Sequence, residues 1–184
     1  KLTGLHQKVG NFPGITVDKK SGQFDFEDSR IDVVDLPGAY SLQPRSMDEE
    51  VTANAIVNPK NIDHPDLVLI VVDASHLKTS LYLALQVLEH KIPAILVMNM
   101  ADQLTRLSPD LDLDSLAQQL DVPLVKTVAR DGDGIKELKE SIVSHSLNSP
   151  KVSWDANHKE RHIIIKHILD NAKASEPVLA HTLT

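Results

Sequence analysis

The stretch Asp35-Leu36-Pro37-Gly38 has a carboxylate three residues before a glycine, directly after an apolar, β-branched run that begins at Ile31. Such a run predicts a buried strand, and ligands of open α/β sheets bind at the carboxyl ends of the strands. An Asp here can hold Mg²⁺ through water, and a Gly N–H can approach a γ-phosphate because no Cβ is in the way. The pattern also suits a plain strand end before a Pro-Gly turn, so its meaning depends on the residues downstream.

A second polar group comes from the segment that precedes this strand. Residues 5–18 contain two glycines, a proline and an asparagine without periodicity, which predicts a loop. The end of this loop, Gly14-Ile15-Thr16-Val17, offers a threonine hydroxyl, a hard oxygen ligand of the kind that Mg²⁺ takes beside a γ-phosphate. The alternative is an ordinary surface threonine.

A third group, Asn99-Met100-Ala101-Asp102, follows another apolar run. A carboxylate accepts two parallel hydrogen bonds, and guanine presents two adjacent donors, N1–H and the 2-amino group, that adenine lacks in this arrangement. Asp102 would therefore select guanine, and Asn99 would contact the base or brace neighbouring loops. N-x-x-D alone is also a common helix-cap pattern. The order D-x-x-G, then a buried strand ending at Asp73, then N-x-x-D gives the combination its specificity.

The elements that must position these groups alternate between strand and helix. Strands are predicted at residues 19–26, 30–35, 67–73, 94–98 and 123–127, and helices at 47–57, 78–90, 112–120, 135–147 and 155–174. Ser46 and Glu49 match a capping box at the start of the first helix. The alternation predicts an α/β fold with a doubly wound, mostly parallel sheet, flanking helices and right-handed crossovers.

Composition sets limits on the function. The 184 residues, of which 41% are hydrophobic, suit one domain of about 150 residues and an appendage. The net charge of −7 and the scattered Lys and Arg disfavour nucleic acid as a partner. The sequence has no cysteine, which excludes disulfides and thiol catalysis. No apolar run approaches the length of a membrane span, and no signal peptide opens the sequence.

Together these motifs resemble the cytosolic G domain of the ferrous-iron transporter B family, a Ras-like GTPase domain fused to a polytopic membrane domain. The resemblance rests on the segments Leu2-Thr3-Gly4, Val9-Gly10-Asn11-Phe12-Pro13-Gly14-Ile15-Thr16-Val17, Asp35-Leu36-Pro37-Gly38-Ala39-Tyr40-Ser41-Leu42, Val71-Val72-Asp73-Ala74-Ser75, Leu81-Tyr82-Leu83 and Asn99-Met100-Ala101-Asp102. It implies a Ras-like G domain over residues 1–147 and the start of a helical domain over residues 148–184. The pair V-G-N-F-P-G-I-T-V and D-L-P-G-x-Y-S-L is highly specific.

The resemblance also implies roles for individual residues. Phosphate and switch contacts fall on Gly14, Ile15, Thr16, Asp35, Leu36, Pro37 and Gly38, with Mg²⁺ at Thr16 and Asp35. Guanine contacts fall on Asn99, Met100, Asp102, Val128, Ala129 and Arg130. Ala129 stands where the family usually has a serine, so only a backbone contact to guanine O6 would remain in that loop.

The resemblance further implies slow hydrolysis. Ras-like enzymes often carry a water-orienting glutamine shortly after the glycine of D-x-x-G, but Ala39 and Tyr40 follow Gly38 here. No catalytic residue is assigned, and K⁺ is a candidate second cation beside Mg²⁺.

One family motif, the phosphate-binding loop G-x-x-x-x-G-K-[ST], does not occur in the 184 residues. Its charge-assisted hydrogen bonds contribute roughly 1.5–3 kcal/mol each, so the loss of four would cost on the order of 6–12 kcal/mol of nucleotide affinity. The strand that precedes this loop belongs between the strands ending at Asp35 and Asp73, whose facing edges would be left unpaired. We therefore expect the natural protein to have a segment before Lys1, and the 184 residues alone could lack activity.

The main hypothesis is a GTP-binding domain of a ferrous-iron transporter at the cytoplasmic face of the bacterial inner membrane. It would bind and slowly hydrolyse GTP to regulate or power Fe(II) uptake. Its partners would be GTP or GDP, its own C-terminal membrane domain, Fe(II) as the transported ion and, in an oligomer, further copies. The nucleotide would reorganise residues 8–18 and 38–46 and act through the helical appendage. Two alternatives stay open: a soluble GTPase of RNA or ribosome maturation, and a non-hydrolysing regulatory module.

His158 and His162 are four residues apart in the last predicted helix, a spacing that can bind a divalent metal. The neighbouring residues are polar, so a solvated helix face is the preferred interpretation.

Overall fold

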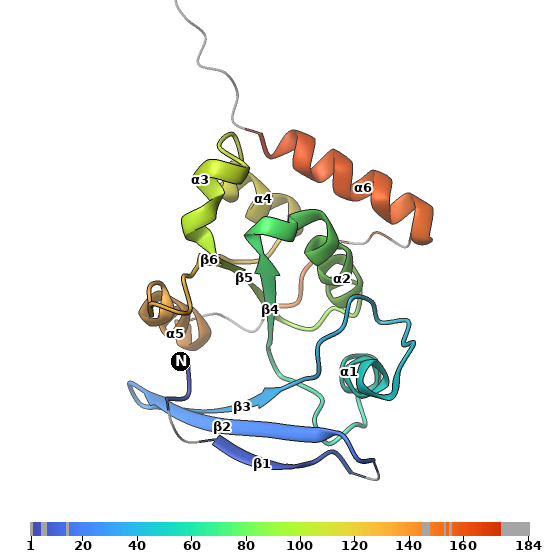
Figure 1. Ribbon diagram of the computed structural model, residues 1–184, viewed down its shortest axis with the longest axis vertical. Coiled ribbons are helices and arrows are strands. Elements are labelled where there is room, and N and C mark those ends of the chain that lie inside the picture. Colours follow the sequence, from blue (N-terminus) through green and yellow to red (C-terminus); the bar gives the residue numbers. More distant parts are fainter. Residues whose placement is uncertain are drawn as a thin grey trace, which may run out of the picture.

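The chain forms two three-stranded sheets, with helices around the second (Figure 1). This computed structural model describes residues 2–4, 7–13, 15–144, 148–152, 154 and 156–173. The strands are β1 (Gln7–Asn11), β2 (Asp18–Phe26), β3 (Ser29–Asp35), β4 (Val68–Asp73), β5 (Ala94–Asn99) and β6 (Leu124–Lys126). The α-helices are α1 (Met47–Val57), α2 (Leu77–Glu89), α3 (Leu104–Leu107), α4 (Leu113–Leu120), α5 (Ile135–Ser144) and α6 (His158–Asn171).

The prediction of a loop over residues 5–18 is wrong for residues 7–11, which form β1. This strand pairs antiparallel with β2, from Gln7 opposite Gly22 to Asn11 opposite Asp18. Its Val9 side chain is exposed, so the strand is held by its backbone hydrogen bonds rather than by a buried apolar face. An alternation of apolar and polar residues arises only where one face of a strand is buried. This exposed strand therefore shows no such alternation in the sequence.

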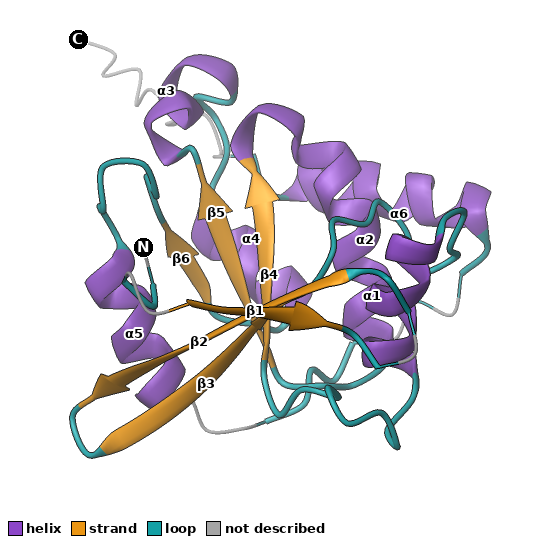
Figure 2. Ribbon diagram, turned by 60° about the horizontal axis from the view of Figure 1, so that its bottom comes forward, coloured by secondary structure: helices purple, strands orange, loops and turns teal. Residues whose placement is uncertain are grey.

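β2 and β3 form the predicted hairpin, with Phe26 opposite Ser29 next to the turn and Lys20 opposite Asp35 at the other end. Among the described residues, β3 pairs only with β2 and β4 pairs only with β5, so each is an outer strand of its own sheet. This agrees with the expected unpaired edges of the strands that end at Asp35 and Asp73. Figure 2 shows the two sheets set at an angle to each other.

The second sheet is the parallel sheet that the continuously apolar runs predict. Its strand order is β4-β5-β6, with Asp73 opposite Asn99 and Met98 opposite Lys126. One face, which includes Val72 and Leu96, packs against α2 and α4, with α6 beyond them. The other face packs against α5 and the β2–β3 hairpin. A parallel sheet with helices on both faces confirms the predicted fold class (Figure 2).

The capping box predicted at the start of α1 is confirmed only for Ser46. Ser46 Oγ accepts a hydrogen bond from Glu49 N at 3.3 Å, but the Glu49 carboxylate accepts from Arg45 N at 2.8 Å instead of completing the box at Ser46. α5 is described as far as Ser144, and the predicted continuation over 145–147 lies outside the described residues. The sequence did not predict the single turn α3. No helix within the described ranges is long and apolar enough to cross a membrane.

Candidate nucleotide-binding site

Asn99 links the end of β5 to the loop that follows β6. Its Oδ1 accepts hydrogen bonds from Ala129 N at 3.1 Å and from Thr127 Oγ1 at 3.2 Å. Thr127 is buried, and its backbone N–H donates to Met98 O at 2.8 Å. Of the two roles that the sequence left open for Asn99, bracing a neighbouring loop is the one that these contacts display.

Asp102 lies just beyond this brace, in a short 3₁₀ turn over Ala101–Gln103. Met100 enters the turn at φ +58°, a left-handed conformation that redirects the chain at the strand end. Ala101 N donates to Thr127 O at 3.1 Å, which ties the turn to the loop after β6. The Asp102 side chain is 39% exposed, so its carboxylate can be approached from solvent.

Arg130 reaches Asp102 from the loop after β6. Its Nη2 lies 3.4 Å from Asp102 Oδ2, and its Nε donates to both carboxylate oxygens of Asp131 at 3.1 and 3.2 Å. The hydrogen bonds and charge of Asp131, followed by the charge of Asp102, raise the pKa of the Arg130 guanidinium above its usual value. The predicted guanine residues, Asn99, Met100, Asp102, Val128, Ala129 and Arg130, thus come together in two adjoining loops.

Glycine shapes the second of these loops. Val128 N donates to Asp133 O at 3.1 Å, and Gly132 N donates to Val128 O at 3.0 Å. Gly134 has φ +76°, and a Cβ on it would lie 1.9 Å from the carbonyl oxygen of Lys126. Only glycine lets the chain pass this close to the end of β6, and the loop position therefore depends on it.

The phosphate-side residues form a second group. Ile15 and Leu36 pack against the same small cluster around Phe12, Val17 and Val51, which brings the two predicted switch loops together. Thr52 Oγ1 donates to Pro37 O at 2.7 Å and anchors the D-x-x-G turn to α1. Leu36 and Met100 both pack against the main core, but no hydrogen bond among the described residues joins this group to the guanine group. The predicted phosphate residue Gly14 lies outside the described residues.

Thr16 and Asp35 fit a Mg²⁺ ion by their chemistry. Both are exposed, and a hydroxyl and a carboxylate are hard oxygen ligands of the kind that Mg²⁺ prefers. Within the part of the chain that the structure describes, the Asp35 carboxylate makes no hydrogen bond or ion pair, so its oxygens are free to take a ligand or a water. Gly38 is exposed as well.

Comparisons with known proteins identify the family of this chain. A family model described as ferrous iron transport protein B matches residues 1–142. The chain belongs to the ferrous iron transport protein B family. The Fe(2+) transporter FeoB of Salmonella typhimurium is 41% identical over 152 residues, which are 80% of this chain and 19% of the relative. A Porphyromonas gingivalis protein named Fe(2+) transport protein A/Fe(2+) transporter FeoB fusion protein is 39% identical over 144 residues, or 78% of this chain and 17% of the relative.

Solved structures of this family share the fold. The cytosolic domain of the T. maritima FeoB iron transporter in its GDP form II superposes with a TM-score of 0.76 at 35% identity, covering 86% of this chain and 62% of that one. The G domain of the same transporter superposes with a TM-score of 0.68 at 39% identity, covering 77% of this chain and 84% of that one. The chain spans about a fifth of the length of the curated relatives it matches.

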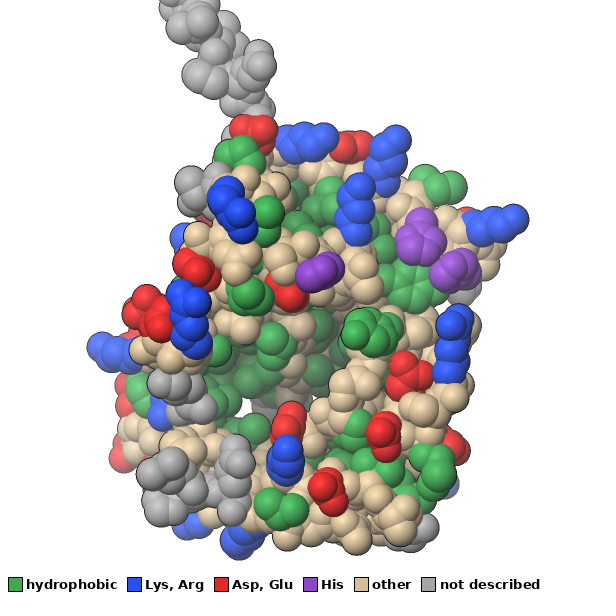
Figure 3. Space-filling model, viewed as in Figure 1, with side chains coloured by type: hydrophobic (Ala, Val, Ile, Leu, Met, Phe, Trp, Pro, Cys, Tyr) green, Lys and Arg blue, Asp and Glu red, His purple; other side chains and the backbone are tan. Residues whose placement is uncertain are grey.

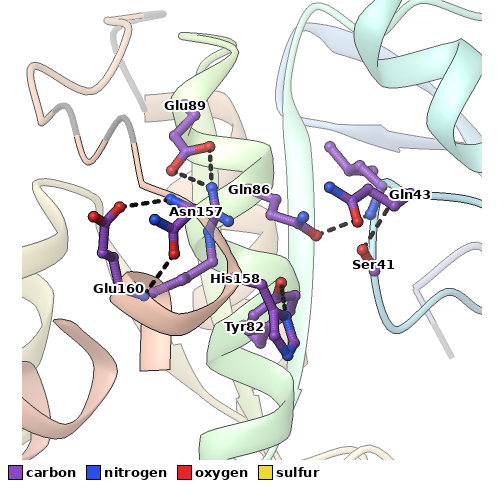
Figure 4. A network of polar contacts seen from close by, with 10 residues as sticks. Ser41, Gln43, Tyr82, Gln86, Glu89, Asn157, His158 and Glu160 are labelled. Atoms are coloured by element: carbon purple, nitrogen blue, oxygen red, sulfur yellow. Dashed lines mark hydrogen bonds and ion pairs between the residues drawn. The ribbon is translucent and has the colours of Figure 1, made fainter. Parts of the chain in front are cut away.

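The structure of this FeoB family member also reveals a polar seam that the sequence did not predict, formed by Leu42, Tyr82, Gln86, Glu89, His158 and Arg161 (Figure 4). Gln86 on α2 is only 6% exposed, and its Oε1 accepts from Leu42 N, in the loop after Gly38, at 2.9 Å. Farther along the seam, Tyr82 Oη lies 2.6 Å from Nδ1 of His158 on α6. α2 therefore touches the loop after Gly38 and α6 at once.

A sequence signal for this seam existed. Gln86 falls on the apolar stripe of α2 beside Leu85, and Arg161 falls on the stripe of α6 that continues with Ile165 and Ile168. A polar residue on an otherwise apolar face of a helix indicates a buried polar contact, because a buried polar side chain without a hydrogen-bond partner would destabilise the folded state.

His158 and His162 lie on an exposed helix face, as preferred from the sequence, but their rings also pack against Tyr82, that of His158 in an edge arrangement. The ring centroid of Tyr82 lies 5.3 Å from that of His158 and 5.1 Å from that of His162. Figure 3 shows histidine side chains side by side over the N-terminal part of α6. Across the described residues there is no group of three or more His, Cys, Asp or Glu side chains that could hold a metal ion. On the face drawn in Figure 3, basic and acidic side chains are interspersed.

Proposed function

We propose that this chain is the guanine-nucleotide-binding domain of a ferrous-iron transporter. The observation that carries the proposal is the exposed Asp102 carboxylate next to a loop held by Asn99 at 3.1 Å. A carboxylate at this site can accept hydrogen bonds from both N1–H and the 2-amino group of guanine. Adenine offers no such pair of donors, so the site would select guanine.

The phosphates of the nucleotide would lie toward Thr16, Asp35 and Gly38. A bound Mg²⁺ would offset the negative charge of the phosphates. Thr16 and Asp35 would hold it through oxygen atoms, and the N–H of Gly38 would donate to a phosphate oxygen. We propose further phosphate or switch contacts at Gly14, Ile15, Leu36 and Pro37. The exposure of Thr16, Asp35 and Gly38 supports this assignment.

Hydrolysis of GTP by the domain would be slow, because Ala39 and Tyr40 follow Gly38 where Ras-like enzymes often carry a water-orienting glutamine. K⁺ is the second cation that we propose beside Mg²⁺. In the complete protein, GTP binding and hydrolysis would regulate or power Fe(II) uptake. The domain would lie at the cytoplasmic face of the bacterial inner membrane, joined to a membrane domain and able to act within an oligomer.

The polar seam supports a route from the nucleotide to the rest of the protein. We propose that residues 148–184 begin a helical domain and that α2 transmits the state of the loop over residues 38–46 to α6. Gln86 and Glu89 both lie on α2. Gln86 contacts this loop, and Glu89 forms an ion pair with Arg161 of α6. A rearrangement of the loop could therefore shift α2 and, through the contacts of α2 with α6, change the position of α6.

Calorimetric titration with GDP and Mg²⁺ tests the nucleotide site. Because the 184 residues contain no G-x-x-x-x-G-K-[ST] motif, the titration uses the natural full-length protein. We expect micromolar or tighter binding of GDP and no measurable binding of ADP. Replacing Asp102 by Asn should shift the preference from GDP to xanthosine diphosphate, because xanthine offers an acceptor where guanine has its 2-amino donor. An unchanged GDP preference in D102N would remove Asp102 from the site.

A GTPase assay on the same protein separates a slow enzyme from a non-hydrolysing regulatory module. Phosphate release above the rate of free GTP supports the enzyme, and binding without release supports the regulatory module.

A further inference from the structure

We propose that the ion pair between Lys19 and Asp63 is a latch that positions Thr16 for a bound nucleoside triphosphate. Lys19 follows Thr16 by three residues at the start of β2, and Asp63 lies in the segment after α1. Both would act through Thr16 rather than on the nucleotide, so they are positioning residues. The inference rests on the proposed function and names two side chains that the proposed function does not use.

Asp63 is held in place at the end of α1. Its backbone N–H donates to Asn61 Oδ1 at 2.8 Å, and Asn61 N donates in turn to Asn58 O at 2.9 Å. The next residue, His64, donates from its backbone N–H to Asn61 O at 3.0 Å, and its Nδ1 lies 2.9 Å from Ala55 O of α1. These contacts tie the backbone of Asp63 to the helix, so its carboxylate has a firm support.

Lys19 connects this support to the loop that carries Thr16. Its Nζ donates to Asp63 Oδ1 and lies 5.6 Å from the ring centroid of Phe12, at the other end of the same loop. The Asp63 side chain is 7% exposed and that of Lys19 is 25% exposed, so solvent and salt screen this pair less than a surface pair. One ammonium group therefore holds both ends of the loop over residues 12–17 to the segment after α1.

The latched loop lies next to the D-x-x-G turn. Ile15 and Val17 flank Thr16, and they pack in the same cluster as Leu36 of that turn. α1 also anchors the turn, through the hydroxyl of Thr52. One helix and the segment after it thus hold both loops, and the latch keeps Thr16 beside the turn.

A loop held in this position should favour a triphosphate over a diphosphate. A threonine that takes Mg²⁺ beside a γ-phosphate strengthens binding only when that phosphate is present. If the loop is in place for only a fraction of the time, the apparent affinity for the triphosphate falls by that fraction. Asp63 Oδ2 is buried and has no hydrogen-bond partner among the described residues, so the contact of Oδ1 with Lys19 carries the latch.

The experiment measures dissociation constants of GDP and of the non-hydrolysable GTP analogue GMPPNP, both with Mg²⁺, on the natural full-length protein. The wild type, D63A, T16A and the double variant D63A/T16A are compared. Asp63 is the residue to change, because Lys19 can then turn to solvent, whereas loss of Lys19 would leave a buried carboxylate without its counter-charge. We expect D63A to raise the ratio of the GMPPNP and GDP dissociation constants about threefold to tenfold, with GDP binding changed less than about twofold.

The double variant shows whether Asp63 acts through Thr16. We expect D63A to leave the ratio unchanged once Thr16 is Ala, and a further rise there would overturn the inference. Lys19→Arg keeps the ion pair and should keep the wild-type ratio. An unchanged ratio in D63A, or an equal loss of affinity for both nucleotides, would show a role in stability alone and would also overturn the inference. A wild type that bound neither nucleotide would overturn the proposed function, and this inference with it.

Discussion

The buried guanidinium of Arg161 on α6 donates from Nη2 to both carboxylate oxygens of Glu89 on α2, at 2.6 and 2.7 Å. The Arg161 side chain is only 7% exposed, and its Nε is buried without a hydrogen-bond partner in the part of the chain that the structure describes. The charge of Arg161 is therefore balanced mainly by Glu89. This pair joins residues that are 72 positions apart and holds α6 against the nucleotide-binding fold.

Replacing Glu89 by Gln should destabilise the protein strongly. The change would leave a buried Arg161 charge without its counter-charge, and breaking such a pair typically costs about 3–5 kcal/mol. Glu89 retains some solvent contact, so we expect about 3 kcal/mol, measured by urea unfolding. The double variant E89L/R161M should recover most of this loss, because it removes both charges. A matched exposed pair, Lys136 and Glu140, should give less than about 0.5 kcal/mol in K136A. Equal losses in E89Q and K136A would contradict this account.

Replacing Gln86 by Leu should loosen the loop after Gly38. Leu42 N would lose its acceptor, and a hydrogen bond of this kind contributes about 1 kcal/mol. Amide exchange of Leu42 should therefore become about fivefold faster. Gln119→Leu is the control, since Gln119 Nε2 donates to Ile168 O of α6 at 3.1 Å and does not touch the loop. Unchanged exchange of Leu42 in Q86L would remove Gln86 from the proposed route to α6.

Replacing Gly134 by Ala should displace the loop after β6. The added Cβ would lie 1.9 Å from Lys126 O, and the backbone is in a left-handed conformation. Strain and overlap together should cost more than about 2 kcal/mol. Gly132→Ala separates the two causes, because Gly132 has φ +98° but open space around its Cβ, so about 1 kcal/mol is expected. Both values come from thermal or urea unfolding. Similar losses in the two variants would exclude the overlap.

Asp73 should make stability depend on pH in the acid range. Hydrogen bonds from the Ser75 hydroxyl and backbone, with a smaller contribution from His76, lower the pKa of Asp73 below its usual 3.8. A lowered pKa in the folded state stabilises the protein above pH 3.8, and this contribution is lost as the pH falls through the folded-state value. D73N should therefore be less stable than the wild type at pH 7, by less than about 1 kcal/mol because the side chain is partly exposed.

The difference between the wild type and D73N should close as the pH falls below 3.8, in urea unfolding followed over a pH series. Ser75→Ala, which removes the largest cause, should give the same trend at smaller amplitude. A gap that stayed constant with pH would show that Asp73 acts through its cap geometry alone.

Local patterns in the sequence predicted most of the elements and the chemistry. The apolar runs at residues 67–73 and 94–98 became β4 and β5, because a strand buried on both faces needs apolar residues throughout. D-x-x-G and N-x-x-D were recognisable because ligand contacts depend on residue type and short spacing. Caps such as Ser46 are local in the same sense. β1 was not predicted, because this exposed strand is held by its pairing with β2 and no local sequence pattern records that pairing.

Tertiary structure decided the partners of the polar groups. The sequence left open whether Asn99 contacts the base or braces a loop, and only the folded chain brings Ala129 N within 3.1 Å of it. The contacts of Gln86 with Leu42 and of Arg130 with Asp102 likewise join segments far apart in the chain. The sequence by itself predicted which side chains have the chemistry to bind a nucleotide, and it determined most of the strands and helices, since these depend on composition and short-range spacing. Which of these side chains meet was decided by the packing of whole elements around a shared core, because contacts between distant segments form only when those elements are brought together.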